Sequence, residues 1–433
     1  MAAALRSERM MLFIIGAVQF INILDFMMVM PLGPDFSRAL DIPLSHVGYI
    51  GGSYTAAASI SGLLGAFFLD RFDRKKALIV CLGGLVAGTA LGGFATGLPS
   101  LIAARLVAGA FGGPATSLAM SIVADLVPTE RRGKAVGAVM GAFSVASVLG
   151  VPFGLKLALW FDWRMPFFAV AGAGAVVLAL AALQLPPVRG HLDAAKGKAP
   201  VPLRALLTRP SMLLSWTMTA VVMTAGFLII PNMASYLQEN LGFPREDLGT
   251  LYLLGGALSF GVMRGGGWLV DRFGSFRVGT AASFLIGTML WVGFIRHLEA
   301  LPVIALFPLF MGALALRNVA YNTLTSKVPA QTERARFMSI QSAVQHLASA
   351  LGAFGSAQLL HVAADGSLLG VDRMAGTSLA LTALLPLMLF LVERRVRRPD
   401  VAAHQGMQPH ELQSGVTSSG AGMPRPPPDE GRS

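Results

Sequence analysis

The chain has 433 residues, and apolar side chains account for 54% of it before its 49 glycines are counted. Charged residues make up only 13%, about half of the ~25% found in soluble domains. Such a composition cannot cover a water-facing surface, which excludes a soluble helical protein. The net charge of +11 comes from basic residues in short turns between apolar runs. That placement is typical of membrane proteins and argues against nucleic acid as a partner.

Residues that bind metals or cofactors are scarce. The single cysteine, Cys81, lies in an apolar run and excludes an intramolecular disulfide and a cysteine-based metal cluster. No phosphate-binding glycine loop, zinc pair, dinucleotide fingerprint or nucleophile elbow occurs in a loop large enough to hold a domain. The sequence therefore predicts no metal, no cofactor and no enzyme, and it disfavours an ATP-driven pump.

Twelve apolar runs are long enough to cross a bilayer, which takes roughly 20 residues per helix. The first follows Arg6 and Arg9 and exceeds the ~7 to 15 residues of a secretory signal core, so we interpret it as an uncleaved span. The predicted spans are 10–33, 47–69, 77–97, 99–124, 135–160, 165–186, 211–238, 248–270, 278–298, 301–325, 338–362 and 375–393.

These spans predict an all-α integral membrane fold with two bundles of six helices. We assign residues 1–186 to the N-terminal bundle and 211–393 to the C-terminal bundle. Residues 187–210 mix Pro, Gly, Lys and Arg and are expected to form a cytoplasmic linker. Residues 394–433 have no apolar period and are expected to be a disordered cytoplasmic tail.

The two halves carry an internal repeat. Asp70-Arg71-Phe72 recurs as Asp271-Arg272-Phe273, 201 positions later. The same displacement relates Gly48 to Gly249, Gly65 to Gly266, and Val127-Pro128 to Val328-Pro329. A constant displacement over several helices indicates a duplication and hence two pseudo-symmetric bundles.

Lysine and arginine are distributed unequally between the two sides of the predicted membrane. Most lie on the side that holds both termini, the linker and the turns after spans 2, 4, 8 and 10. The opposite side carries only Arg38, Lys156, Arg164, Arg245, Arg296 and Arg373. Because cytoplasmic segments are enriched in Lys and Arg, we expect a multi-pass protein of the plasma (inner) membrane with both termini in the cytoplasm.

The repeated turn resembles a signature of the major facilitator superfamily, in which Gly, two or three apolar residues and Asp-Arg-x-Gly-Arg join helices 2 and 3 and again helices 8 and 9. Here Asp73 replaces the second glycine, and the second copy has Ser275 and Phe276 where basic residues are usual. The resemblance implies the major facilitator fold. It also implies that Asp70 lies near the start of helix 11 and Asp271 near the start of helix 5.

The same resemblance implies a latch on the cytoplasmic side. A carboxylate at a helix start gains roughly 0.3 to 1 kcal/mol from the helix dipole, in addition to any pairing with an arginine. The alternative is a topological anchor with no role in gating. The expected gating residues are Asp70, Arg71, Arg74, Arg131, Asp271, Arg272 and Arg336.

Further stretches resemble the 12-span drug/proton antiporters. Arg105-Leu-Val-Ala-Gly109 is similar to a helix 4 signature of proton-coupled members, and Leu24-Asp25-Phe-Met-Met-Val-Met-Pro31 to their acidic stretch in helix 1. Gly150-Val-Pro152-Phe-Gly154 resembles the antiporter signature of helix 5, although Val151 separates a glycine and a proline that are adjacent in the family. The alternative for this stretch is a packing kink without export.

Charged residues inside the predicted spans are candidates for function. A charge at membrane depth costs roughly 2.5 to 3.5 kcal/mol even on the lenient insertion scale, unless it is paired or faces water. Asp25 and Arg105 should lie at matching depths, ~9 to 12 Å from the outer surface at 1.5 Å per residue. We expect a proton carrier and its partner, and the alternative is a static ion pair. Arg264 can instead extend to the nearby cytoplasmic surface.

The resemblance places helices 1, 4, 7, 8, 10 and 11 around a central cavity, with Asn22, Arg317, Gln345 and His346 facing it. Arg317 and His346 are both expected ~12 Å from the cytoplasmic face, close enough to meet. For His346, a hydrogen bond between helices is the alternative to ligand contact.

These features predict a monomeric secondary transporter that moves a small molecule across the lipid bilayer by alternating access, most similar to proton-coupled antiporters that export drugs. One alternative is a proton symporter or facilitator for a sugar or organic acid. Another is a membrane receptor without transport, which would be expected to have lost the buried charges and the loop signatures. The identity of the substrate depends on side-chain packing in the cavity and is not specified by the sequence.

Overall fold

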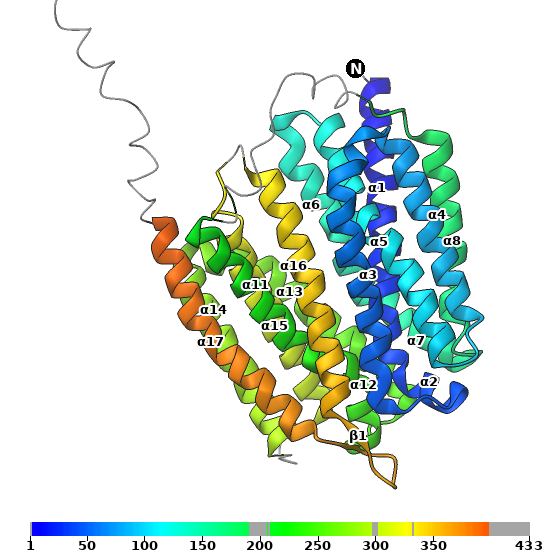
Figure 1. Ribbon diagram of the computed structural model, residues 1–433, viewed down its shortest axis with the longest axis vertical. Coiled ribbons are helices and arrows are strands. Elements are labelled where there is room, and N and C mark those ends of the chain that lie inside the picture. Colours follow the sequence, from blue (N-terminus) through cyan, green and yellow to red (C-terminus); the bar gives the residue numbers. More distant parts are fainter. Residues whose placement is uncertain (1, 190–205, 207, 297–301, 331–332, 398–433) are drawn as a thin grey trace, which may run out of the picture.

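A computed structural model describes residues 2–189, 206, 208–296, 302–330 and 333–397. Most of the predicted linker 187–210 and most of the predicted tail 394–433 lie outside these ranges. Figure 1 shows the helices as two groups side by side, the N-terminal half in blue to blue-green and the C-terminal half in green to orange. The described chain thus has the predicted all-helical architecture of twelve long helical spans.

The elements of the N-terminal half are α1 (Ala2–Val29), η1 (Met30–Leu32), α2 (Gly33–Leu40), η2 (Leu44–His46), α3 (Val47–Phe68), η3 (Leu69–Arg71), α4 (Arg74–Gly93), α5 (Leu98–Leu126), α6 (Thr129–Val145), η4 (Ala146–Gly150), α7 (Val151–Trp160) and α8 (Met165–Gln184). Those of the C-terminal half are α11 (Pro210–Ile229), η5 (Ile230–Asn232), α12 (Met233–Ser235), η6 (Tyr236–Asn240), η7 (Arg245–Asp247), α13 (Leu248–Phe273), α14 (Ser275–Leu290), η8 (Trp291–Ile295), α15 (Val303–Thr325), α16 (Arg334–Leu359), β1 (His361–Val362), β2 (Leu368–Leu369) and α17 (Val371–Arg397).

Proline and glycine interrupt several of the predicted spans. Pro31 and Pro231 lie in matching 3₁₀ turns, η1 and η5, at the ends of the first helix of each half. The fifth span contains a π turn, η4, directly before α7, in which Pro152 is the second residue. A proline removes one helical hydrogen bond and crowds the preceding turn, which accounts for these local changes of pitch.

The eleventh span differs from its predicted range of 338–362. It begins at Arg334 and ends at Leu359, because the next residue is extended and His361 and Val362 pair with Leu369 and Leu368 in a short antiparallel hairpin. Glycines with positive φ, Gly366 and Gly370, turn the chain at this hairpin. The periodicity of the helix did not indicate the hairpin.

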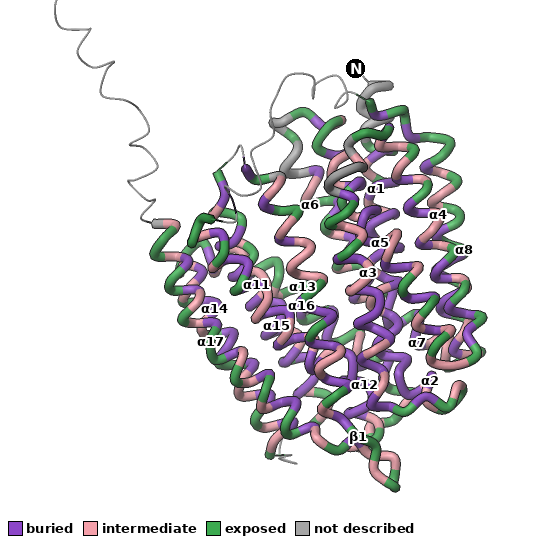
Figure 2. Tube along the Cα trace, viewed as in Figure 1, coloured by how far each residue is buried: buried purple, intermediate pink, exposed green. Residues whose placement is uncertain are grey.

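Nine helices in the described ranges are long and apolar enough to cross a membrane. The other three, α3, α13 and α16, lie along the boundary between the halves, where α3 packs on α16 and α13 packs on α7. Their glycines and small polar residues suit close helix contact rather than exposure to lipid. Buried residues line the interior of each group of helices, and exposed residues cover the outside (Figure 2).

The two halves are in contact at the end of the molecule opposite the N-terminus, where α2, α12 and β1 lie (Figure 1). Arg245 binds the Asp35 carboxylate through Nη2 at 2.8 Å and Nε at 3.1 Å. The Lys156 Nζ donates to the Glu246 carbonyl at 3.1 Å. These contacts join residues more than eighty positions apart and were not foreseen from the sequence, which placed the basic residues only by membrane side.

Candidate functional site

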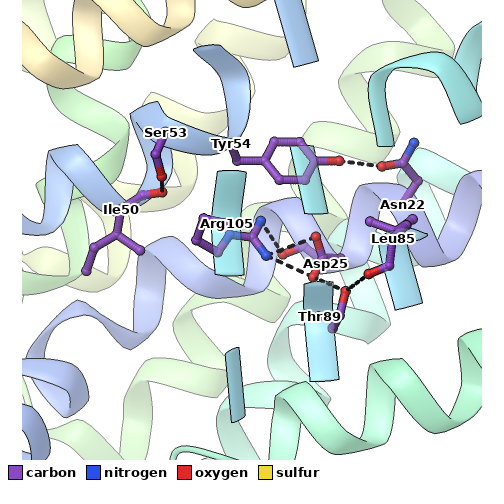
Figure 3. Close-up of polar contacts among 8 residues, drawn as sticks. All are labelled: Asn22, Asp25, Ile50, Ser53, Tyr54, Leu85, Thr89 and Arg105. Carbon is purple, nitrogen blue, oxygen red and sulfur yellow. Dashed lines mark hydrogen bonds and ion pairs between the residues drawn. The ribbon is translucent and has the colours of Figure 1, made fainter. Parts of the chain in front are cut away.

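An ion pair lies buried in the middle of the N-terminal half. Asp25 on α1 is 0% exposed and Arg105 on α5 is 1% exposed. The Arg105 Nη1 donates to both Asp25 carboxylate oxygens, at 2.9 and 3.0 Å, and Nη2 donates to the Asp25 carbonyl at 3.3 Å (Figure 3). The structure therefore brings together the two residues that sequence depth alone had matched.

Two further side chains complete the surroundings of this pair. The Thr89 hydroxyl of α4 lies 2.8 Å from Asp25 Oδ1 and also 2.8 Å from the Leu85 carbonyl. The Arg105 guanidinium lies over the Tyr54 ring of α3, 4.6 Å from its centroid, which is a favourable cation–π geometry. Neither Thr89 nor Tyr54 was singled out from the sequence. For Thr89 the available signal was a lone polar residue within an apolar span, whereas Tyr54 lies in a short polar stretch between Ser53 and Thr55.

The glycines of α5 allow α3 to approach closely enough to place Tyr54. A Cβ at Gly109 would collide with the Tyr54 backbone, and one at Gly112 would lie 2.9 Å from the Asn22 Oδ1. Gly109 lies one turn after Arg105, on the same helix face. The Arg-x-x-x-Gly spacing thus places the Arg105 charge one turn from Gly109, where the lack of a side chain makes room for the Tyr54 backbone.

Asn22 lies in the same polar cluster rather than in open space. It is 4% exposed and accepts a hydrogen bond from the Tyr54 hydroxyl. Its Nδ2 lies 2.7 Å from the Gly112 carbonyl and 2.6 Å from the Thr116 Oγ1. In this structure Asn22 joins α1, α3 and α5. Contact of Asn22 with a substrate stays a prediction.

The helix 5 motif packs directly against the segment that carries Asp25. A Cβ at Gly150 would lie 2.7 Å from Leu24 Cδ1, and one at Gly154 would lie 3.9 Å from the Met28 Cβ. Pro152 lies between them on the first turn of α7. The motif therefore forms a kinked helix face that contacts α1 on both sides of Asp25.

The other side of the same kink contacts the C-terminal half. A Cβ at Gly256 of α13 would lie 2.9 Å from the Ser147 carbonyl and 3.0 Å from the Val148 Cα, both in η4. The π turn thus lies between the buried ion pair and the boundary between the halves.

The predicted cavity residue Arg317 of the C-terminal half makes fewer hydrogen bonds within the described ranges than Arg105 in the buried ion pair. Arg317 of α15 is 4% exposed, and its Nη2 donates to the neighbouring Asn318 Oδ1 at 3.3 Å. Gln345 and His346 of α16 are half-buried. Among the described residues, no hydrogen bond joins Arg317 to His346, although depth alone had allowed them to meet.

The predicted gating residues lie at the end of the bundle nearest the N-terminus. Asp70 belongs to η3, and its side chain is outside the described set. Arg74 forms an ion pair with Asp125 at 2.8 Å and donates to the Ser121 carbonyl at 3.0 Å, so it links the first turn to α5 within its own half. Arg336 is half-buried, and the other predicted gating residues are exposed: Arg71, Arg131, Asp271 and Arg272.

Asp73, which replaces a family glycine, anchors the segment that follows α8. Its carboxylate accepts hydrogen bonds from the Val188 amide at 3.1 Å, the Arg189 Nε at 3.0 Å and the Lys75 amide at 3.0 Å. Burial acts to raise the pKa of Asp73, but these hydrogen bonds outweigh it and hold the pKa below its usual value. The substitution therefore creates a cap for α4 and a tether for the start of the linker.

The long apolar helices define an integral membrane protein. Residues 15–353 match the Major Facilitator Superfamily, which is more than half of the chain. The chain belongs to this family, whose members move small molecules across membranes and are not enzymes. The predicted fold, the multi-pass membrane location and the absence of enzymatic function are confirmed at this level.

Two relatives cover part of the chain. It is 28% identical over 246 residues to a chloramphenicol resistance protein of Streptomyces lividans, which is 57% of this chain and 62% of that protein. It is 26% identical over 257 residues to the uncharacterized MFS-type transporter YtbD of Bacillus subtilis, which is 59% of this chain and 62% of that protein. The matched region therefore spans less than two thirds of either relative.

Solved structures share the fold over nearly the whole chain. A crystal structure of a D-xylose–proton symporter matches with a TM-score of 0.71 and 16% identity, over 89% of this chain and 97% of that chain. A bacterial homologue of the human lysosomal transporter Spinster, in an inward-facing and unoccupied conformation, matches with a TM-score of 0.67 and 17% identity, over 90% and 98%. At these identities the similarity establishes the fold alone.

Proposed function

We propose that this chain is a proton-coupled exporter of a small molecule or drug, which acts by alternating access as a monomer in the inner membrane. The buried Asp25–Arg105 pair carries the proposal, because charged side chains inside the bilayer are costly and typically mark functional sites such as proton relays. The partial similarity to a chloramphenicol resistance protein supports export rather than uptake. Both termini are placed in the cytoplasm by the distribution of Lys and Arg.

Thr89 gives the proposed proton carrier a partner in both protonation states. A threonine hydroxyl has one hydrogen to donate and two lone pairs to accept with. An ionised Asp25 accepts that hydrogen at 2.8 Å. A protonated Asp25 can donate to Thr89 instead, while the Thr89 hydrogen turns to the Leu85 carbonyl at the same distance. The Thr89 hydroxyl and the protonated Asp25 carboxyl can therefore both be hydrogen-bonded, whether or not Asp25 carries the proton.

The kink at η4 offers a route from the proton site to the movement of the two halves. It contacts Leu24, next to Asp25, on one side and Gly256 of the opposite half on the other. A change in the charge of Asp25 would alter the packing of α1 on this kink, and the kink would transmit the change to α13. In this proposal, Gly150, Pro152 and Gly154 serve coupling as well as packing.

The remaining predicted roles belong to the same proposal. The two repeated turns would latch the halves together on the cytoplasmic side when the cavity is open to the outside, through Asp70, Asp271 and the arginines near them. Asn22, Arg317, Gln345 and His346 would contribute to the substrate cavity.

A reporter fusion tests the proposed orientation in the membrane. A reporter fused after Arg245 should report the outer side of the membrane, and a cytoplasmic signal there would contradict the orientation.

Everted membrane vesicles test the coupling directly. Respiration acidifies their lumen, which acridine orange reports by quenching of its fluorescence. Chloramphenicol, followed by a panel of other drugs, is then added outside. A proton antiporter would release lumenal protons and restore fluorescence, whereas a symporter would not, because it moves proton and substrate in the same direction.

Two variants sharpen this assay. Asp25→Asn should abolish the recovery of fluorescence while the protein still inserts in the membrane. Asp162→Asn is the matched control, because that carboxylate lies half-exposed in a loop and pairs only with the nearby Arg164 at 3.4 Å. Full recovery in the Asp25 variant would assign the proton to another group. No recovery with any compound in the wild type would contradict export.

A further inference from the structure

Arg317 is a buried cation that has no anionic partner among the residues the structure describes. In the described part of the chain its only hydrogen bond goes from Nη2 to Asn318 Oδ1, at a long 3.3 Å, and its buried Nε has no partner. Arg105, the buried cation of the N-terminal half, donates three hydrogen bonds to Asp25. Among the described residues, Arg317 therefore departs from the rule that buried charges are paired.

Among the described residues of the C-terminal half, no acidic side chain lies at the depth of Arg317. The described acidic residues of the C-terminal half all lie in loops or at the ends of helices: Glu239, Glu246, Asp247, Asp271, Glu333, Asp365, Asp372 and Glu393. Arg317 lies eight residues from the end of α15, or about 12 Å at 1.5 Å per residue. A bound anion would supply the counter-charge that this part of the bundle lacks.

The guanidinium extends between two sets of helices. α15 packs mainly on α13 and α14, whereas α11 packs mainly on α16 and α17. Arg317 reaches from α15 to α11, where a Cβ at Gly226 would lie 3.5 Å from its Nη2. Gly226 of α11 therefore lies within ordinary contact distance of the guanidinium.

The surroundings of this position are apolar and adjoin the opposite half. Phe227, next to Gly226, packs on Phe26 of α1 with ring centroids 5.9 Å apart. Tyr321, one turn after Arg317, is buried with Met218 and Val222 of α11. A molecule bound here would meet one cation and several aromatic and aliphatic surfaces.

We propose that Arg317 binds the acidic group of the transported molecule, and that the substrate class is a small organic anion, such as a carboxylate on an apolar body. This inference rests on the proposed transport function and adds the charge of the substrate. A guanidinium presents paired N–H donors that match a carboxylate. The Nε group, which has no partner among the described residues, and Nη1 are the donors that such an anion would use.

Benzoate is the probe, and benzamide is its uncharged analogue of nearly the same shape. The purified full chain in detergent is titrated with each at pH 7.5, and its melting temperature is recorded. Benzoate should raise the melting temperature of the wild type with a saturable dependence on concentration, and benzamide should not. Arg317→Gln should weaken the benzoate response at least tenfold, and Arg317→Lys, which keeps the charge but loses the fork, by a smaller factor.

The stability of the unliganded variants provides a second readout. Arg317→Gln removes an unpaired charge and should melt at or above the wild-type temperature, whereas Arg105→Gln strands Asp25 and should melt lower. An unchanged benzoate midpoint in Arg317→Gln would overturn the inference, as would a loss of stability equal to that of Arg105→Gln. Equal stabilisation by chloride at the same concentration would also overturn it, since the site would then hold an inorganic anion only. Drug-dependent recovery of fluorescence in the vesicles tests export separately, so the two proposals can fail independently.

Discussion

Arg105→Gln should be among the most destabilising single substitutions in the transmembrane region. The change removes the two hydrogen bonds of Nη1 to the Asp25 carboxylate, the bond of Nη2 to the Asp25 carbonyl and the contact with the Tyr54 ring. Asp25 is then left with Thr89 as its hydrogen-bond partner. Removing one member of a buried ion pair costs about 3–5 kcal/mol, mostly because the remaining charge is stranded.

The expected change in melting temperature follows from the size of the chain. The entropy of unfolding is about 2 cal/mol/K per residue, which gives roughly 0.9 kcal/mol per degree for a chain of this length. The loss therefore corresponds to a fall of about 3 to 6 °C. The purified variants should be compared in one detergent at a single scan rate, because unfolding of such proteins is often irreversible.

Arg164→Gln is the matched control. Arg164 also contacts a carboxylate, Asp162 at 3.4 Å, and an aromatic ring, Trp163 at 4.6 Å from its centroid, but its side chain is 43% exposed. Exposed pairs contribute about 0–1 kcal/mol, so its melting temperature should fall by about 1 °C or less. Arg105 and Arg164 thus each contact a carboxylate and an aromatic ring, and they differ in how far they are buried.

A double variant separates pairing from the loss of individual side chains. Asp25→Asn alone strands the Arg105 cation, and the combined Asp25→Asn and Arg105→Gln variant leaves two neutral amides that can bond each other. The combined loss should be smaller than the sum of the two single losses. A fall for Arg105→Gln no larger than that of Arg164→Gln, or strict additivity in the double variant, would refute the reasoning.

Three other expectations concern proton transfer, gating and pH. Thr89→Val should reduce gradient-driven export by about 10- to 100-fold, the equivalent of a hydrogen bond to a charged group, and Thr89→Ser should retain it; equal export in both would remove the relay. Asp70→Asn should raise the labelling rate of a cysteine introduced at Met338 by about 2- to 5-fold, the range set by the helix dipole, whereas no change would leave only a topological anchor. Asp73 has a folded pKa below its ordinary 3.8, so its stabilisation is present above that value and disappears as the pH falls through the lower folded value. Asp73→Asn should therefore melt lower than the wild type at pH 7, with a difference that shrinks towards pH 3, and a difference independent of pH would contradict this.

The orientation of each helix about its own axis was the main quantity that the sequence left open. The depth of Asp25 and Arg105 could be counted along each helix at a fixed rise per residue, and the structure places the two side chains together. The same counting allowed Arg317 and His346 to meet, but depth does not say which way a side chain points. Thr89 and Tyr54 were missed for the same reason, since each depends on the face that α4 or α3 turns towards α1 and α5.

The sequence by itself determined the membrane class, the twelve spans and the duplication, because apolar length and repeated motifs are properties of the chain read locally. Only the tertiary structure decided that the helix 5 kink lies between Asp25 and the opposite half, that Asp35 pairs with Arg245, and that Arg317 has no anionic partner among the described residues. Each of these is a relation between helices far apart in the sequence. Such relations depend on how side chains pack when the halves come together, which no spacing along one chain records.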